Sequence, residues 1–376
     1  MASKEIPGIV GIGSSVGRRL VTNRDIAEKV AEYRNTARGR KPELLTRLES
    51  SVLKMLGPIG TDTRYWVDEN QCTSDLALAA AVEALEMAKK SPRDLKAITI
   101  ATMSQDYLGV PVAPAVQHKL GARDDIPTKD IQDACAGAIY ALNDVFTDMT
   151  STLGRGGPQL AIGAEVLSKH IDPSQADVYG LFGDGAGALV IDMVEDKQDV
   201  ESKIQFHLGG DGYFQQDLLI PAGGTVHPTS AQTLKDGMHC LQMNGPVIKK
   251  QAIKRMVESV EIVTKAANLK PGDISLFIPH QANREIIIET AKLLNFPIER
   301  VYININRYGN TSAASIPLAM HDAYYEGRLK PDEMIVIASL GAGVSYGAAT
   351  LPTTGLPKRS SFGVLQSRLG HILPPR

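Results

Sequence analysis

The chain has 376 residues, 43% of them hydrophobic, which is enough for two ordinary domains or one large duplicated fold with a substantial core. Its 40 basic and 42 acidic side chains leave a net charge of −2, which excludes a globally basic nucleic-acid or membrane-surface binder. No segment approaches the roughly 18 to 20 apolar residues of a membrane span, so we expect an unprocessed, soluble, cytoplasmic protein.

The cysteines give a second exclusion. Cys72, Cys135 and Cys240 are far apart and have no CxxC spacing, which argues against a disulfide framework and against a structural zinc site. A reducing cytosol is the natural setting for such a chain, and we expect no metal site.

The first segment, PGIVGIGSSVG, predicts a short buried strand that ends in a Gly/Ser turn. Gly11, Gly13 and Gly17 do not match the GxGxxG spacing, and no P-loop lysine follows them. We therefore expect no phosphate-binding loop here.

Residues 22–56 have a helical pattern, with Asn23 as a candidate N-cap. Apolar residues at spacings of three and four predict one buried helix face, either as core packing or as a mobile cap over a site: Leu45, Leu48, Val52 and Leu56.

Two later passages share one architecture. The helix DLALAAAVEALEMAKKS leads through PRDLKA into the strand AITIAT, and a second helix leads through KPGDIS into the strand LFIP. Asp94 and Asp273 occupy equivalent places, 179 residues apart, which indicates an internal duplication. We divide the chain into halves at 1–197 and 198–352, followed by a basic tail at 353–376.

Strands that are apolar on both faces alternate with helices, as in LAIGAEVL, GALVIDMV and EMIVIASL. This pattern predicts an α/β fold whose sheets are covered by helices on each side. In the segment FGDGAGALVI we expect Asp184 to stabilise a turn rather than to perform chemistry.

Three polar residues stand at ends of elements, where chemistry is commonly placed. Cys135 in DIQDACAGAIYAL lies near a predicted helix N-terminus, which stabilises a nucleophilic thiolate, although a lone cysteine is more often structural. His280 follows the buried strand LFIP, where open α/β sheets present functional groups. Asn310 lies in the turn of NRYGNTSAASIPLAM and by itself would be read as a helix cap.

A glycine-rich turn in SLGAGVSYGAA could offer backbone N–H groups to an oxyanion. Cysteine, histidine and asparagine occur in the order of papain-like proteases, but the CGSCW-type signature is absent and the α/β pattern is wrong for that class.

The strings DACAGAIYAL, FGDGAGALVI, MNGPV, PHQANREII, RYGNTSAASIPLAM and GAGVSYGAA occur in the order found in thiolase-fold condensing enzymes. From about Ile9 to about Leu351 the chain most closely resembles the 3-oxoacyl-[acyl-carrier-protein] synthase III family. The resemblance implies a duplicated αβαβα fold, a homodimer, and the catalytic residues Cys135, His280 and Asn310.

The implied reaction has two steps and needs no metal or tightly bound cofactor. Cys135 takes an acyl group from an acyl-CoA or acyl-carrier-protein thioester, and a malonyl thioester then decarboxylates and attacks it. His280 and Asn310 bind the malonyl thioester carbonyl, and backbone N–H groups of Cys135, Ala342 and Gly343 bind the acyl carbonyl. Thiolases use a second cysteine in the C-terminal glycine-rich loop, and GAGVS has none.

The chain also departs from the family. A stretch from Tyr33 to Thr63 replaces the usual tryptophan and RTGI-type string that contact the CoA adenine. At Gly109 the family commonly has a bulky gate, so we expect an open channel and a primer longer than acetyl. The other channel candidates are Asn244, Gly245 and Leu340.

Three alternatives remain at this point. One is a head-to-head acyl-condensing enzyme of olefin or ketone synthesis, which has a glutamate where YLGVP has glycine. The others are an acyltransferase that delivers its acyl group to an alcohol or amine, and a non-catalytic thiolase-fold subunit.

A basic cluster is the candidate docking surface for the acidic helix of an acyl carrier protein, although a solvated helix face explains it equally well. Its members are Lys249, Lys250, Lys254, Arg255, Arg284 and Lys292.

Overall fold

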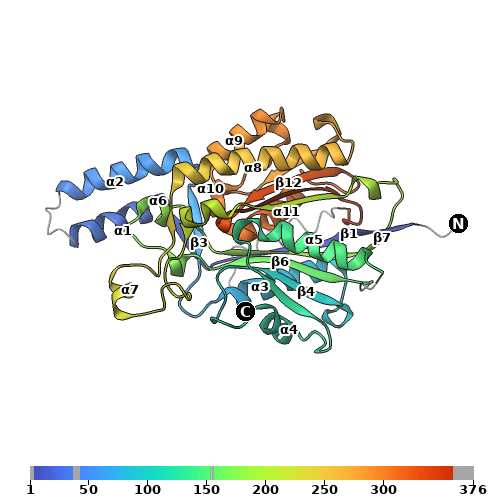
Figure 1. Cartoon of the computed structure of the whole chain (residues 1–376), viewed down its shortest axis with the longest axis horizontal. Coiled ribbons are helices and arrows are strands. Elements are labelled where there is room, and N and C mark those ends of the chain that lie inside the picture. The colour runs from blue at the N-terminus through green and yellow to red at the C-terminus, as the bar shows by residue number, and fades with distance from the viewer. Residues whose placement is uncertain (1–3, 37–42, 153, 155, 359–376) are drawn as a thin grey trace.

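The computed structural model describes residues 4–36, 43–152, 154 and 156–358. Two sheets enclose a central helix layer of α5 (Gly137–Thr150) and α11 (Ser315–Tyr325), as Figure 1 shows. Helix α3 (Thr73–Ala88) covers the outer face of the first sheet, and α8 (Gly245–Ala266) covers the second. The predicted αβαβα layers are confirmed.

The two sheets repeat one strand order. The first is β1-β7-β6-β4-β5, with bounds Glu5–Val16, Gly185–Glu195, Gln159–Glu165, Ala97–Ala101 and Thr128–Ile131. The second is β8-β13-β12-β11, with bounds Gln205–Gly210, Ser345–Pro352, Met334–Leu340 and Leu276–Pro279. Where the first sheet has β5, the second has a single parallel bridge between Phe277 and Val301.

Parallel and antiparallel pairs also correspond. Strand β4 is parallel to β6 and β11 is parallel to β12, and the next two pairs in each sheet are antiparallel. The central helices bury Ile139, Leu142, Ile316 and Met320 between the sheets, which explains why these helices are apolar on more than one face.

The Asp94 and Asp273 turns have one geometry. In the 3₁₀ helix η2 (Pro92–Asp94), the Asp94 carboxylate accepts a 2.8 Å hydrogen bond from Ser91 N. In η7 (Pro271–Asp273), Asp273 accepts one of 2.8 Å from Lys270 N. The predicted equivalence of the two turns is confirmed, while the boundaries 1–197, 198–352 and 353–376 stay a prediction. Residues 359–376 lie outside the described part of the chain.

The prediction of a short first strand is wrong, because β1 continues through the Gly/Ser segment to Val16. A Cβ at Gly11 would lie 2.1 Å from the Ala84 carbonyl oxygen, and one at Gly13 would lie 2.1 Å from that of Ala80. These glycines let β1 contact the backbone of α3 rather than form a turn.

The predicted helical stretch at 22–56 contains α1 (Asn23–Thr36) and α2 (Glu43–Leu56), which extend together to one side in Figure 1. Its N-cap is Thr22 rather than Asn23: Thr22 Oγ1 accepts a 3.2 Å bond from Asp25 N, and the Asp25 carboxylate accepts one of 2.7 Å from Thr22 N. Val52 and Leu56 are buried as predicted and Leu48 is partly buried; the Leu45 side chain lies outside the described set.

The predicted role of Asp184 is confirmed. Its buried carboxylate accepts bonds of 2.8 Å from Val67 N and from Ser168 N, so it holds two loops beside the start of β7. The smaller elements are β2 (Arg19–Thr22), β3 (Thr63–Trp66), α4 (Ala113–Leu120), α6 (Ala176–Tyr179), β9 (Leu218–Leu219), α7 (Ala231–Lys235), β10 (Gln242–Met243), α9 (Arg284–Leu293) and α10 (Ile305–Tyr308). Within the described residues, no helix has the length and apolar character needed to cross a membrane.

Candidate active site

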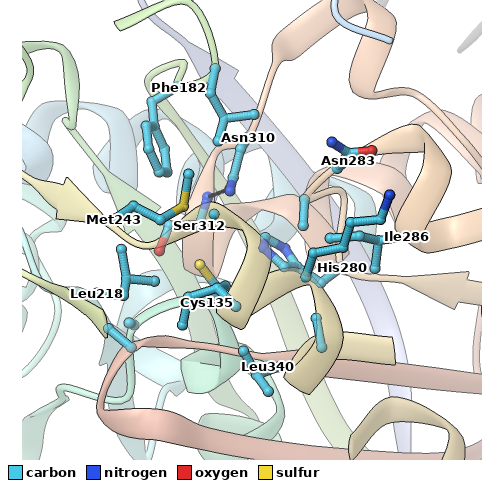
Figure 2. Close-up of a pocket in the computed structure, with 18 of the residues that line it drawn as sticks. Cys135, Phe182, Leu218, Met243, His280, Asn283, Ile286, Asn310, Ser312 and Leu340 are labelled. Atoms are coloured by element: carbon cyan, nitrogen blue, oxygen red, sulfur yellow. Dashed lines mark hydrogen bonds between the residues drawn. The ribbon is translucent and has the colours of Figure 1, made fainter. Parts of the chain in front are cut away.

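Cys135 lies in a sharp turn, the 3₁₀ helix η3 (Ala134–Ala136), which connects β5 to α5. Ala134 has a φ of 44°, in the left-handed region that few residues with a Cβ adopt. The Ser339 hydroxyl donates a 2.7 Å hydrogen bond to the Cys135 carbonyl oxygen and so links the turn to β12. The turn directs the sulfur into a pocket (Figure 2).

The protonation state of Cys135 differs from the thiolate that its place near a helix N-terminus predicted. Burial raises the pKa of Cys135 to about 12, so the resting side chain is a neutral thiol despite its place at a helix N-terminus. The neighbouring Ser312 hydroxyl, which can donate to a thiolate, acts in the opposite direction and lowers this pKa, while the Glu165 charge raises it.

His280 follows β11 directly and is buried on the pocket wall. Its backbone N–H donates to the Ala338 carbonyl at 2.8 Å, and its ring Nδ1 lies 2.6 Å from Ser315 Oγ. Burial lowers the pKa of His280 to about 3, so the imidazole is neutral near pH 7.

Asn310 is buried in the turn after α10, where Gly309 adopts a φ of 66°. Its Oδ1 accepts a 2.8 Å hydrogen bond from Ser312 N, shown as the dashed line in Figure 2. This bond orients the side chain amide and leaves its N–H₂ group as a donor on the pocket wall.

The pocket has a volume of about 380 Å³ and brings together Cys135, His280 and Asn310 from three segments that are distant in the sequence (Figure 2). Most of its wall is apolar: Ile59, Met103, Leu167, Leu181, Phe182, Leu218, Leu241, Met243, Ile248, Ala252 and Ile286. Such an apolar cavity with a few convergent polar groups is typical of a small-molecule site.

The other predicted pocket residues divide into two groups. Gly245, Leu340 and Ala342 line the pocket, and Gly343 and Asn244 are not in its wall. Asn244 donates a 2.8 Å bond to the Asp217 carboxylate at the start of α8.

Gly109 lies on an exposed turn away from the pocket of its own chain, with a φ of 82°. Its neighbours Tyr107, Leu108 and Val110 are 75%, 76% and 55% exposed. Three adjoining apolar side chains are therefore open to solvent on this turn.

The basic candidates are not one continuous free surface. Lys249 lines the pocket and forms a 2.6 Å ion pair with Glu285. Arg255 pairs with Asp211 at 2.6 Å and with Glu258 at 3.1 Å, so it is committed within the fold.

The remaining candidates are exposed. The stem of Arg284 packs against Gly60, and Lys254 lies 3.9 Å from the Glu258 carboxylate. Lys250 and Lys292 are exposed on α8 and α9.

Sequence reasoning missed three polar residues, namely Ser312 on the pocket wall and Ser315 and Glu165 behind it. Ser315 contacts His280, and the buried Ser312 hydroxyl donates a 3.1 Å bond to Glu165. A single acidic residue within the apolar run LAIGAEVL was the available signal for Glu165.

Two family models match the chain. The model of 3-oxoacyl-[acyl-carrier-protein (ACP)] synthase III matches residues 129–212, and the model of the C-terminal part of the same enzyme matches residues 264–352. The protein of that name from Symbiobacterium thermophilum is 36% identical over 92% of this chain and 97% of its own length. The chain belongs to the 3-oxoacyl-[acyl-carrier-protein] synthase III family. It is therefore a condensing acyltransferase, and the papain-like reading and the non-catalytic reading are not supported.

Solved structures agree with the family. Synthase III from Aquifex aeolicus is 33% identical, covers 92% of this chain and 99% of its own, and has a TM-score of 0.77. The priming β-ketosynthase of the R1128 polyketide pathway is 26% identical over 94% of this chain and 98% of its own, with a TM-score of 0.77. OleA of Xanthomonas campestris, crystallised with lauric acid and lauroyl-CoA, is 17% identical over 92% of this chain and 98% of its own, with a TM-score of 0.74, a likeness in fold alone.

Proposed function

We propose that Cys135 is the nucleophile of this synthase III and carries the acyl group between the two steps. Its sulfur attacks the thioester carbonyl of the donor, the carrier thiolate leaves, and the acyl group remains on Cys135. The observation that supports this most directly is the convergence of Cys135, His280 and Asn310 on one apolar pocket.

In the second step, His280 and Asn310 donate hydrogen bonds to the thioester carbonyl of a malonyl extender. Loss of carbon dioxide leaves an enolate, whose carbon attacks the acyl-cysteine and releases a 3-oxoacyl thioester. The neutral imidazole supports this role, because Ser315 can donate to Nδ1 and leave the proton on Nε2. The Ser312 N–H holds Asn310 with its amide nitrogen free to donate.

Backbone N–H groups of Cys135, Ala342 and Gly343 form the second oxyanion hole in this proposal. Gly341 brings the two segments together, because a Cβ there would lie only 2.7 Å from Cys135 N. The Ser345 hydroxyl, which donates a 2.7 Å bond to Asp133, further ties the turn to the Cys135 segment.

The preferred primer is an acyl chain longer than acetyl, since the wall around Cys135 is formed largely by apolar side chains. The enzyme acts as a homodimer in which the apolar turn at Gly109 is covered by a second copy. The turn lies beside β5, the edge strand of the first sheet: Asp130 on this strand accepts bonds of 2.6 and 2.9 Å from Val112 N and Ala113 N, which follow the turn. An apolar turn held at the edge of a sheet supports contact with a second copy.

Acyl carrier protein is the proposed macromolecular partner. Lys249 at the pocket wall, with the exposed Lys250 on the same helix, supports docking of an acidic helix at the mouth. We also infer a cytoplasmic location, because Cys72, Cys135 and Cys240 are all free thiols.

The test is the intact mass of the protein after incubation with acyl-CoA and acyl-carrier-protein donors of increasing chain length. We expect an acyl-sized gain that is absent in Cys135→Ala and largest for donors longer than acetyl. His280→Ala should still gain the acyl mass but should lose condensation with malonyl thioesters by about 100-fold or more. A folded wild-type protein that no donor labels would overturn the proposal, and equal rates with acetyl and octanoyl donors would overturn the primer assignment.

A further inference from the structure

A carboxylate with no cation beside it among the described residues lies behind the pocket. Glu165, the last residue of β6, is fully buried. Its oxygens accept hydrogen bonds from Ser104 Oγ at 2.6 Å, Thr102 Oγ1 at 3.3 Å, Ser312 Oγ at 3.1 Å and Met103 N at 3.2 Å. Burial raises its pKa to about 7, so this group exchanges a proton near neutral pH.

The Ser312 hydroxyl joins this carboxylate to the nucleophile. It donates to Glu165 Oε1, and its side chain lies with that of Cys135 on the pocket wall (Figure 2), where it lowers the pKa of the thiol. Ser312 has a φ of 49°, an uncommon conformation for a residue with a side chain, and it is fully buried. Its side chain is therefore fixed by the surrounding packing, with the hydroxyl directed to Glu165.

The site offers no other ready acceptor for the thiol proton among the described groups. His280 has Nδ1 engaged by Ser315, and its low pKa makes it a poor base. A second negative charge beside an ionised Glu165 would also be costly in a buried site.

We propose that Glu165 receives the thiol proton of Cys135 through the Ser312 hydroxyl and is thereby a positioning residue for the first acyl transfer. This inference rests on the proposed role of Cys135. It adds to that role a named destination for the proton.

The step balances in atoms and charge. The Cys135 S–H bond breaks, Ser312 Oγ takes that proton and passes its own proton to Glu165 Oε1, and the sulfur becomes the thiolate. One negative charge moves from carboxylate to sulfur, so the buried site keeps the same total charge. Ser312 can then donate to the thiolate, which is the interaction that lowers the pKa of Cys135. When the carrier thiolate leaves, it takes up a proton, and Glu165 returns to the carboxylate form.

Within the described part of the chain, few other titratable groups face Glu165, so few could cause the same inflection in the alkylation rate. The loop at 102–104 presents hydroxyls and one backbone N–H, and the Ser312 segment presents a hydroxyl. Cys135 is the titratable group that faces it from η3. Asp184, beside the paired strand β7, directs its carboxylate to Val67 and Ser168 instead.

The test is the rate of Cys135 alkylation by iodoacetamide from pH 5.5 to 9.5, measured on the Cys135 peptide by mass spectrometry. It needs no acyl donor, so it is independent of the donor experiment above. In the wild type we expect the rate to rise to a plateau through an inflection near pH 7. Glu165→Gln should remove the inflection, leave a rate that rises continuously with pH, and react about 100-fold more slowly at pH 7.

Two further variants separate this role from a structural one. Ser312→Ala should also lose the inflection, because the link between carboxylate and sulfur is gone. Ser104→Ala is the matched control: it removes a bond that favours the ionised carboxylate, so the inflection should persist and move to higher pH. Circular dichroism and thermal melting check that each variant is folded.

The proposal is overturned by an unchanged inflection in folded Glu165→Gln or Ser312→Ala, or by its absence in the wild type. An inflection that persists in Glu165→Gln and Ser312→Ala but disappears in His280→Ala would assign the proton to His280 and also overturn the proposal. Acyl labelling of Cys135 with a failed inflection test would leave the proposed function standing without the relay. A clear inflection in a protein that no donor labels would support the proton relay and overturn the proposed function.

Discussion

The Cys135 turn and the Ser312 turn are two copies of one structure with different tasks. Each is a 3₁₀ helix that begins at a residue with positive φ and leads into a central helix, α5 or α11. Cys135 in the first copy corresponds to Ala313 in the second. One turn presents a sulfur to the pocket, whereas Ala313 is fully buried and absent from the pocket wall.

The duplicated fold therefore contains two equally sharp turns, and only one of them presents a thiol to the pocket. The second turn supports the first, because Asn310 just before it and Ser312 at its start line the pocket. The loss of β5's counterpart, reduced to the Val301 bridge, accompanies this change of task. Substitutions made in pairs, one in each half, can test how far the two copies have diverged.

The largest effect is expected at the turns themselves. Cys135→Ala should reduce acyl transfer by about 10⁴-fold or more, because the proposed nucleophile is removed. Adding Ala313→Cys to this variant should restore nothing, since that position does not open to the pocket. The readout is acyl mass gain, and any labelling of the new cysteine would show that the two turns are interchangeable.

The second pair of substitutions concerns Gly341 and Gly163, the glycines against which the backbones of the two turns pack. A Cβ at Gly341 would lie 2.6 Å from the Asp133 carbonyl oxygen, and one at Gly163 would lie 2.2 Å from that of Ala313. Each change to alanine should lower the free energy of unfolding by about 1–3 kcal/mol, measured by urea denaturation. Gly341→Ala should in addition slow acylation, because it displaces Cys135.

Gly272→Ala serves as the control for this pair, because a Cβ there meets no atom within 4 Å. Its stability should remain within about 0.5 kcal/mol of the wild type. Equal stability of the Gly341 and Gly163 variants with this control would contradict the packing argument.

A third comparison concerns the central helices. Eight residues after Cys135 the first half has Asn143, and eight after Ala313 the second half has the buried His321. Burial alone would lower the His321 pKa, but bonds to Asp322 and to Glu83, 3.1 Å away, outweigh it and raise the pKa to about 9. The second half therefore has a pH-sensitive contact between α3 and α11.

Because the folded-state pKa of His321 exceeds its ordinary value of 6.5, its stabilisation is complete below pH 6.5 and is lost as pH rises through about 9. We expect the wild type to be more stable at pH 6 than at pH 9.5 by up to about 3 kcal/mol from this group. His321→Gln should lose most of that difference in urea denaturation at the two pH values. An unchanged difference would assign the effect to other groups.

The smallest effect is expected at the two turns that precede β4 and β11. Asp94→Ala and Asp273→Ala each remove one carboxylate that caps an exposed backbone N–H, so each should cost about 1 kcal/mol. Thermal melting of both variants measures the cost. A marked difference between them would show that the two copies no longer have equal roles.

Much of the architecture could be predicted because its signals are local. Apolar runs such as LAIGAEVL and EMIVIASL are strands, and the repeated Pro-x-Asp turn indicated the duplication. Predictions were wrong where a distant segment decided the outcome. The Gly11 and Gly13 segment stays extended because α3 packs on it, and no pattern within that segment records the contact.

The site shows the same division. Cys135, His280 and Asn310 each stand at an end of an element, so motif strings identified them as candidates. Their convergence on one pocket, however, depends on how two sheets pack across the central helices. Gly109 shows the limit, because a position taken from local alignment lies outside the pocket of its own chain.

The sequence by itself determined the layered α/β class, the internal repeat and the family, because periodicity and short motifs are properties of neighbouring residues. Only the tertiary structure decided that the Cys135 thiol is neutral, and that a hydroxyl on the opposite turn donates to a buried carboxylate behind the pocket. Burial and hydrogen bonding arise between residues far apart in the chain, and these two effects set the protonation of the proposed nucleophile.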